Sequence, residues 1–240
     1  GQLGRNLMDH HFKAGASGVY DGYNDKYYKG RRPNGFYIPR FRNLGPDSKQ
    51  EYLRGFGYQG AASRTNWMRS IKELSVGLGP EFKDSLIMPG EWRLGMNAFG
   101  ECLPYEENRV YLNNEVKDMH GLPTLTIDCE YKENERLMRK DMVNSAAEML
   151  EASGFKDIKI RNDECYPGIG IHEMGTARMG RSAKNSVLNK WNQVWDAPNV
   201  FVTDGSAMTS AACQNPSLTY MAMTARAADY AVSELKKMNL

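Results

Sequence analysis

The sequence has few cysteines and no long apolar stretch. Its 240 residues include four cysteines, at Cys102, Cys129, Cys165 and Cys213. No two of them form a Cys-x-x-Cys pair, so their spacing indicates neither a zinc site nor a redox dithiol. Four cysteines are also too few for a disulfide scaffold, and we expect free, buried thiols. No apolar run approaches the ~20 residues that a membrane-spanning helix requires.

An excess of charge of one sign is also lacking. The chain has 31 lysines and arginines against 29 aspartates and glutamates, a net charge of +2. This balance gives no electrostatic reason to expect nucleic acid or an anionic membrane as a partner. The first ten residues show neither an initiator methionine nor a signal-peptide pattern. We therefore expect the chain to be part of a longer protein.

Short segments with turn residues between them predict a mostly antiparallel sheet. Residues 12–65 are rich in glycine and aromatic residues, which is typical of short strands joined by turns. A short helix is predicted at residues 70–76. Three further strands are expected at residues 92–105, 108–113 and 123–131, the last with a period-two alternation.

Two longer helices are predicted after these strands. The first has Asn134 as a candidate N-cap and ends at Gly154. The second begins at Asn215 and Pro216, a typical cap followed by proline. The apolar faces at helical spacing are Met138, Met142, Ala146, Met149 and Leu150 in the first helix and Leu218, Met221, Ala225, Val232 and Leu235 in the second. The order of elements predicts an α+β fold, a mostly antiparallel sheet with flanking helices.

Among the four histidines, His172 has the most suggestive surroundings. It lies in a glycine-rich stretch, residues 167–180, where the backbone can approach a ligand closely. A histidine there can act as a general base near neutral pH. A lone loop histidine is also commonly a hydrogen-bonded structural residue, so its position alone leaves both roles open. Structural or solvated roles are expected for His10, His11 and His120.

Asn215 has two compatible interpretations. As the N-cap of the last helix it explains the Asn-Pro-Ser sequence at residues 215–217. The start of a helix also carries free N–H groups and partial positive charge. An anion that develops in front of it would be stabilised, so Asn215 can be both a cap and a site residue.

Two other patterns are rejected. Residues 55–60 match G-x-G-x-x-G, but residues 49–54 before them are too polar for a buried parallel strand, and a crossover helix is not indicated after them. Ser206, Asp204 and His172 are the residue types of a hydrolase triad. The sequence has no G-x-S-x-G elbow to present such a serine.

Three blocks near the end of the chain resemble the C-terminal signature of the glucose–methanol–choline (GMC) oxidoreductases. They are residues 172–180, 199–206 and 215–219, in the family's order and spacing. Residues 4–10 resemble the family stretch that leads into the substrate domain. The pairing of His172 with an asparagine is closer to the sugar oxidases and dehydrogenases of the family than to its members with two histidines.

This resemblance implies a domain organisation. Residues 1–11 and 166–240 would belong to the FAD domain, and residues 12–165 would form the substrate-binding domain. Asn189 stands where family members usually have an aspartate. The family's N-terminal FAD-binding βαβ unit, whose G-x-G-x-x-G loop cradles the pyrophosphate, is absent from these residues. We therefore expect this chain alone to bind FAD weakly or not at all and to be inactive.

The resemblance also implies a reaction, the oxidation of a CH–OH group of a sugar or polyol with FAD as cofactor. His172 would take the hydroxyl proton as general base, while the hydride on the same carbon passes to N5 of the flavin. Asn215 would hold the substrate oxygen by a hydrogen bond. The electron acceptor, whether oxygen, a quinone or an acceptor protein, is left open.

The cofactor contacts implied by the resemblance fall on two turns. Asp204 and Gly205 would meet the pyrophosphate and ribityl region of FAD through backbone N–H groups. Pro216 and Ser217 would lie beside the N1–C2 edge of the flavin, where the helix dipole stabilises negative charge.

An alternative function is a carbohydrate-binding module without redox chemistry. Tyrosine and tryptophan are plentiful in residues 20–110 and could stack on sugar rings, although structural roles explain them equally well. His172 together with Asn215 discriminates between the two functions, because a binding module has no need of a base that faces a helix N-terminus.

Overall fold

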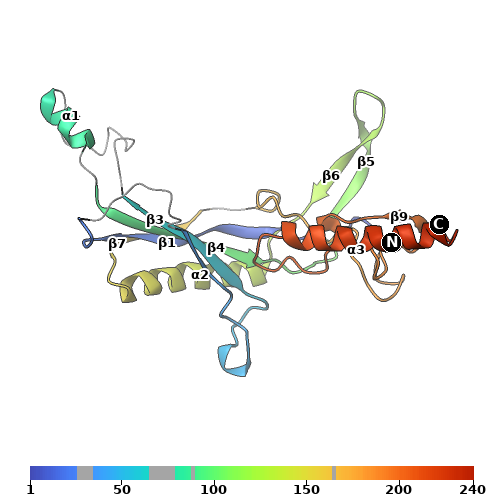
Figure 1. Cartoon of the computed structure of the whole chain (residues 1–240), viewed down its shortest axis with the longest axis horizontal. Helices are drawn as coiled ribbons and strands as arrows, with labels where there is room; N and C mark the ends of the chain where they lie inside the picture. The colour runs from blue at the N-terminus through green and yellow to red at the C-terminus, as the bar shows by residue number, and fades with distance from the viewer. Residues whose placement is uncertain (26–34, 65–78, 88–89, 164–165) are drawn as a thin grey trace.

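A five-stranded antiparallel sheet forms the centre of the fold. The computed structural model describes residues 1–25, 35–64, 79–87, 90–163 and 166–240. The strand order is β2-β3-β4-β1-β7, and each neighbouring pair is antiparallel (Figure 1). The strands are β1 (His10–Tyr20), β2 (Gly35–Ile38), β3 (Phe56–Arg64), β4 (Trp92–Glu101) and β7 (Lys156–Asn162). The predicted α+β fold with a mostly antiparallel sheet is confirmed.

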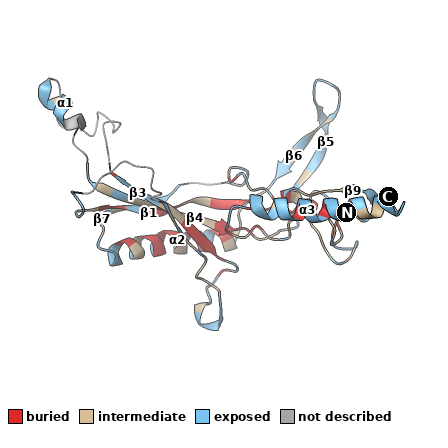
Figure 2. Ribbon diagram, viewed as in Figure 1, coloured by how far each residue is buried: buried red, intermediate tan, exposed pale blue. Residues whose placement is uncertain are grey.

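The helix α2 (Glu133–Ala152) covers one face of this sheet. Its predicted apolar face is confirmed, because Met138, Met142, Ala146 and Leu150 are buried against the sheet in one core cluster (Figure 2). The helix ends as predicted, with Gly154 in the left-handed conformation (φ +80°) directly after the C-cap.

The predicted N-cap of α2 is wrong. The cap position is Lys132, and Asn134 lies inside the first turn. The side chain of Asn134 accepts a hydrogen bond from the N–H of Leu53 (2.7 Å). Asn134 therefore tethers the loop that precedes β3 to the helix. The local sequence does not reveal this long-range contact.

The remaining elements are not part of the five-stranded sheet. They are α1 (Pro80–Ile87), the hairpin of β5 (Arg109–Lys117) and β6 (Pro123–Asp128), the short hairpin of β8 (Gln193–Val194) and β9 (Ala197–Phe201), and α3 (Ser217–Lys236), with 3-10 turns at Pro46–Ser48 and Gly205–Ala207. The hairpin of β5 and β6 projects from the body, and the chain ends shortly after α3 (Figure 1). The short helix predicted at residues 70–76 lies outside the described residues.

The apolar face that the sequence gives α3 is exposed. Leu218 is 78% exposed and Met221 68% exposed, and Val232 and Leu235 are also exposed. The buried side of α3 is formed instead by Met223 and Ala227, and Met223 packs in a small cluster with Leu188 and Ala207. Among the described residues, no helix has the length and apolar character needed to cross a membrane.

The cysteines that the structure describes are free, as predicted. Cys102 and Cys213 are buried and Cys129 is half-buried. Burial raises the pKa of the Cys102 thiol well above its ordinary value. Cys165 lies outside the described residues. The thiols of the described part therefore behave as small packing groups rather than as reactive ones.

His11 lies inside the sheet without a polar partner. It is fully buried in β1, and neither of its ring nitrogens has a hydrogen-bond partner among the described atoms. Burial lowers its pKa to about 3, and the positive charge of Arg139 acts in the same direction. His11 is therefore neutral in the folded protein at neutral pH, in keeping with the structural role expected for it.

We predict that His11→Leu is neutral or stabilising at pH 7 and makes the protein more resistant to acid. The unfolded chain binds a proton at His11 near pH 6.5, but the folded chain does so only near pH 3. Stability is therefore lost as the pH falls through this window, by up to ~1.4 kcal/mol per pH unit. Urea unfolding between pH 4.5 and 7.5 measures the effect.

The matched control for this prediction is His120→Leu, at an exposed turn histidine whose side chain has no buried environment. Its unfolding free energy should keep the wild-type pH dependence. The explanation fails if His11→Leu and His120→Leu change the pH dependence equally.

Candidate active site

The carboxylate of Asp9 organises the backbone around His172. Asp9 is buried, and its two oxygens accept hydrogen bonds from the backbone N–H groups of His10 (2.7 Å), Gly168 (2.9 Å), Gly170 (2.9 Å) and His172 (3.4 Å). A Cβ atom at Gly170 would overlap Asp9 Oδ1. This close approach explains why the loop before His172 contains glycine.

The imidazole of His172 lies against that of His10. The two Nδ1 atoms are 2.9 Å apart, and the ring planes meet at 75°. The other ring nitrogen of His10 lies 3.2 Å from the carbonyl oxygen of Ala211. His10 is fully buried, and this burial lowers its pKa, with a further lowering by His172.

The contact of His10 with His172 was not predicted from the sequence. A structural or solvated role was expected for it, yet its ring lies in direct contact with His172. The two residues are 162 positions apart. The Asp-His pair at positions 9 and 10 is a weak local signal, and only the fold brings it to His172.

Two residues beside these contacts have a left-handed backbone conformation. Ile171, which precedes His172, has φ +55°, and Ala212, which follows Ala211, has φ +54°. This conformation is unfavourable for a β-branched residue such as isoleucine. Strain of this kind persists only where the surrounding contacts fix the chain, and it concentrates at functional sites.

Asn215 does not cap the last helix, so that prediction is wrong. The helix α3 begins at Ser217, Pro216 is at the cap position, and no side chain makes a cap hydrogen bond. The side chain of Asn215 turns instead toward β3, where its Oδ1 accepts a hydrogen bond from Gln59 Nε2 (2.8 Å). The N–H groups of the first turn of α3 therefore receive no side-chain oxygen from the cap.

The segment that leads into α3 lies along the sheet. Ala211 contacts His10, Cys213 Sγ lies 3.9 Å from the hydroxyl of Tyr37, and Asn215 contacts Gln59. A cavity of about 660 Å³ opens between this segment and strands β2 and β3, lined in part by Tyr37, Gln59 and Asn215. Within the part of the chain described, no hydrogen bond joins His172 directly to Asn215. They are linked through His10 and residues 211–215.

The turn after β9 packs against the loop of His172. The carbonyl of Gly205 accepts a hydrogen bond from the N–H of Gly175 (3.3 Å), and a Cβ atom at Gly205 would overlap the carbonyl oxygen of Glu173. The carboxylate of Asp204 accepts hydrogen bonds from the N–H (2.8 Å) and the hydroxyl (2.5 Å) of Ser206. Since Ser206 donates to Asp204 rather than to a histidine, these residues do not form a hydrolase triad.

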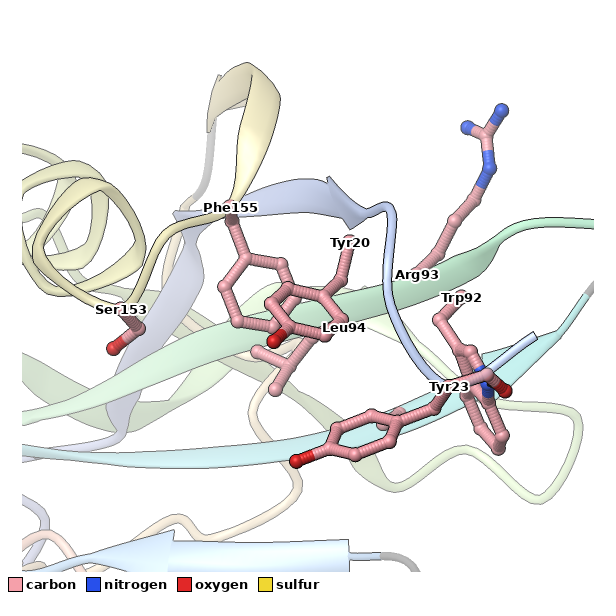
Figure 3. A pocket seen from close by; sticks show the side chains of 8 residues that line it. Tyr20, Tyr23, Trp92, Arg93, Leu94, Ser153 and Phe155 are labelled. Atoms are coloured by element: carbon pink, nitrogen blue, oxygen red, sulfur yellow. The ribbon is translucent and has the colours of Figure 1, made fainter. Parts of the chain in front are cut away.

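A second cavity lies at the other end of β1, about ten residues and therefore roughly 30 Å from His10. It has a volume of about 580 Å³. Figure 3 shows its aromatic lining, which includes Tyr20, Tyr23, Trp92 and Phe155. None of the site residues expected from the sequence lines this cavity.

The model of the family described as GMC oxidoreductase matches residues 104–224. This match covers the three blocks that carried the resemblance, from His172 to the start of α3. The chain belongs to the GMC oxidoreductase family.

Similar proteins include enzymes that are named for small alcohols and sugars. The chain is 34% identical over 236 residues to 2-methyl-1,2-propanediol dehydrogenase of Mycolicibacterium austroafricanum, covering 96% of this chain and 42% of that protein. It is 27% identical over 237 residues to the fructose dehydrogenase large subunit of Gluconobacter japonicus, covering 98% and 42%. A solved structure, pyridoxine 4-oxidase from Mesorbium loti, matches at 15% identity and a TM-score of 0.42, covering 97% of this chain and 43% of that one. The chain thus spans less than half the length of these proteins.

We predict that Asp9→Asn loosens the loop that carries His172. The substitution removes the negative charge and places an NH₂ group among backbone donors, so the hydrogen bonds of Gly168 and Gly170 weaken. The expected loss of stability is about 1.5–3 kcal/mol, the usual range for hydrogen bonds to a charged group. Hydrogen exchange of residues 166–172, followed by mass spectrometry, should become faster.

A matched control for this prediction is Asp118→Asn. Its carboxylate also accepts backbone hydrogen bonds, from His120 (2.8 Å) and Leu122 (2.9 Å), but in an exposed turn. It should leave exchange in residues 166–172 unchanged. Equal and small effects of the two substitutions would contradict the role assigned to Asp9.

Proposed function

We propose that this chain is the catalytic C-terminal part of an FAD-dependent oxidoreductase that oxidises a CH–OH group of a sugar or polyol. The observation that carries the proposal is the contact of His172 with His10, in a loop held by Asp9 and beside the segment that leads to Asn215 and α3. Membership of the GMC family supports an oxidoreductase. The relatives named for propanediol and fructose support a polyol or sugar as substrate.

In this proposal, residues 1–11 and 166–240 belong to the FAD domain, and residues 12–165 form the substrate-binding domain. The site lies where these parts meet, since His10 begins β1 of the sheet and Gln59 reaches from β3 to Asn215. The exposed apolar residues of α3 suit a helix that packs against the rest of an FAD domain.

FAD, when bound, supplies the acceptor for the substrate hydride. The residues near the start of α3 suit its negatively charged reduced form. Ser217 is exposed, and no side chain caps the helix, so the N–H groups of its first turn are available to an acceptor. Asp204 and Gly205 form the second contact region, where the absence of a Cβ atom lets the turn lie close to the loop of His172.

His172 acts as the general base that takes the proton of the substrate hydroxyl, and Asn215 holds the substrate oxygen. The hydrogen bond from Gln59 occupies the carbonyl oxygen of the Asn215 amide. The NH₂ group of Asn215 is then the group that donates to the substrate. His172 contacts the ring of His10, and that ring contacts Ala211, four residues before Asn215. This chain of contacts positions both groups for a bound substrate.

The aromatic cavity of Figure 3 favours a second candidate function, the binding of a carbohydrate without redox chemistry. Tyrosine and tryptophan side chains there present faces on which a sugar ring can stack. A binding module does not need the hydrogen-bond network of Asp9, His10 and His172. For this reason we favour the oxidoreductase.

We predict that the complete protein shows flavin absorption bands and that a sugar or polyol from a broad panel bleaches them without oxygen. His172→Ala should slow flavin reduction by about 10²–10⁴-fold, the usual contribution of a general base. Asn215→Ala should slow it by about 10²-fold, as for the loss of one positioned donor. Stopped-flow spectroscopy of the bound flavin measures both rates.

The control is His120→Ala, a histidine in the exposed turn between β5 and β6, which should leave the rate unchanged. Absence of flavin, together with sugar binding that Trp92→Ala abolishes, would favour the binding module instead. Flavin reduction at the wild-type rate in His172→Ala would contradict the role of His172.

A further inference from the structure

We propose that His10 is a positioning residue that selects the tautomer of His172, so that Nε2 of His172 is the atom that accepts the substrate proton. This inference deepens the proposed function and rests on His172 as its base. It follows from a chain of three groups, the carbonyl oxygen of Ala211, the ring of His10 and the ring of His172.

The first step is the contact of His10 with Ala211. A carbonyl oxygen only accepts hydrogen bonds, so Nε2 of His10, at 3.2 Å, must carry a hydrogen atom and donate it. A neutral imidazole has a single N–H group. The Nδ1 atom of a neutral His10 therefore has a lone pair and is an acceptor.

The second step is the neutrality of His10. Its ring is fully buried, and burial is the largest cause of its lowered pKa. The hydrogen bond with Ala211 and, to a smaller extent, the carboxylate of Asp9 raise the pKa, but the lowering by burial outweighs them. The oxygens of Asp9 already accept backbone hydrogen bonds. Glu101 lies opposite His10 in the register of β1 and β4, where Ser210 and Arg54 are its partners. Neither acidic side chain makes a hydrogen bond to the ring of His10 among those described.

The third step is the contact between the two histidines. Their Nδ1 atoms are 2.9 Å apart, so one of them carries the hydrogen atom. Since Nδ1 of His10 is the acceptor, Nδ1 of His172 is the donor. The single N–H group of a neutral His172 is then used, and its Nε2 atom has a free lone pair. A general base needs this lone pair to receive a proton.

The opposite assignment is unfavourable. If Nδ1 of His10 donated to His172, the lone pair of His10 Nε2 would face the lone pairs of the Ala211 carbonyl at 3.2 Å. A buried carbonyl and a buried ring nitrogen would both lose their hydrogen bond. Asp9 also accepts hydrogen bonds from the backbone N–H groups of both histidines, which holds together the two backbone segments that carry the rings.

Two substitutions of similar size and polarity separate the two contacts of His10. In His10→Asn, the amide oxygen lies as many bonds from Cβ as Nδ1 does, so it still accepts from His172. In His10→Gln, the amide lies at the distance of Nε2, so it reaches Ala211 but leaves His172 without its acceptor. The pair therefore tests the tautomer rather than the presence of a polar side chain.

The decisive measurement is the ¹⁵N chemical shifts of the His172 ring in the complete protein with labelled histidine, above neutral pH. The signal is assigned by its loss in His172→Gln. We expect a protonated Nδ1 and an unprotonated Nε2 in the wild-type protein and in His10→Asn, and a shift toward the opposite tautomer in His10→Gln. The rate of flavin reduction should be at least about 10-fold lower in His10→Gln than in His10→Asn.

A protonated Nε2 in wild-type His172, or identical spectra for the two variants, would overturn the inference whatever the reaction. If His10→Gln does not fold, the tautomer of His172 in the wild-type spectrum is by itself the test of the inference. If the tautomers are as predicted but His10→Gln and His10→Asn reduce flavin at equal rates, His10 selects the tautomer of His172. His172 is then not the base. The spectrum and the rate thus separate the failure of this inference from the failure of the proposed function.

Discussion

The site depends on one interaction, the acceptance of backbone N–H groups by the buried carboxylate of Asp9. A buried charge is strongly unfavourable unless hydrogen bonds compensate it. Here the four donors come from His10 and from the loop of Gly168, Gly170 and His172, so the compensation ties the beginning of β1 to that loop. Hydrogen bonds to an ionised group are stronger than neutral ones and hold these parts firmly.

The sheet and α2 hold in place the beginning of β1, which follows Asp9. β1 lies between β4 and β7, and its inner face packs against the methionines of α2. The same sheet supplies Gln59 from β3 and Tyr37 from β2, and both contact residues 211–215. Residues that are distant in the sequence are therefore held together by one packed layer, and the strained backbone at Ile171 and Ala212 is kept in place by the contacts on either side.

Features could be predicted from the sequence where the signal was local or where several sequence blocks pointed to the same family. The apolar face of α2 follows from its periodicity, and the family follows from three blocks in order. The sequence failed where a tertiary contact competes with a local preference. Asn134 and Asn215 are ideal caps, yet each turns its side chain to a distant partner. His10 was missed because its contact with His172 exists only after the sheet has formed.

The central claim is that His172 receives the substrate proton at a site shared with Asn215. The most direct measurement is a crystal structure of the complete protein with FAD and a non-reactive substrate analogue. The account predicts His172 Nε2 within about 2.6–3.2 Å of the analogue's hydroxyl oxygen, with the Asn215 amide donating to the same oxygen. A hydroxyl bound by another residue, with His172 directed away from it, would contradict the account.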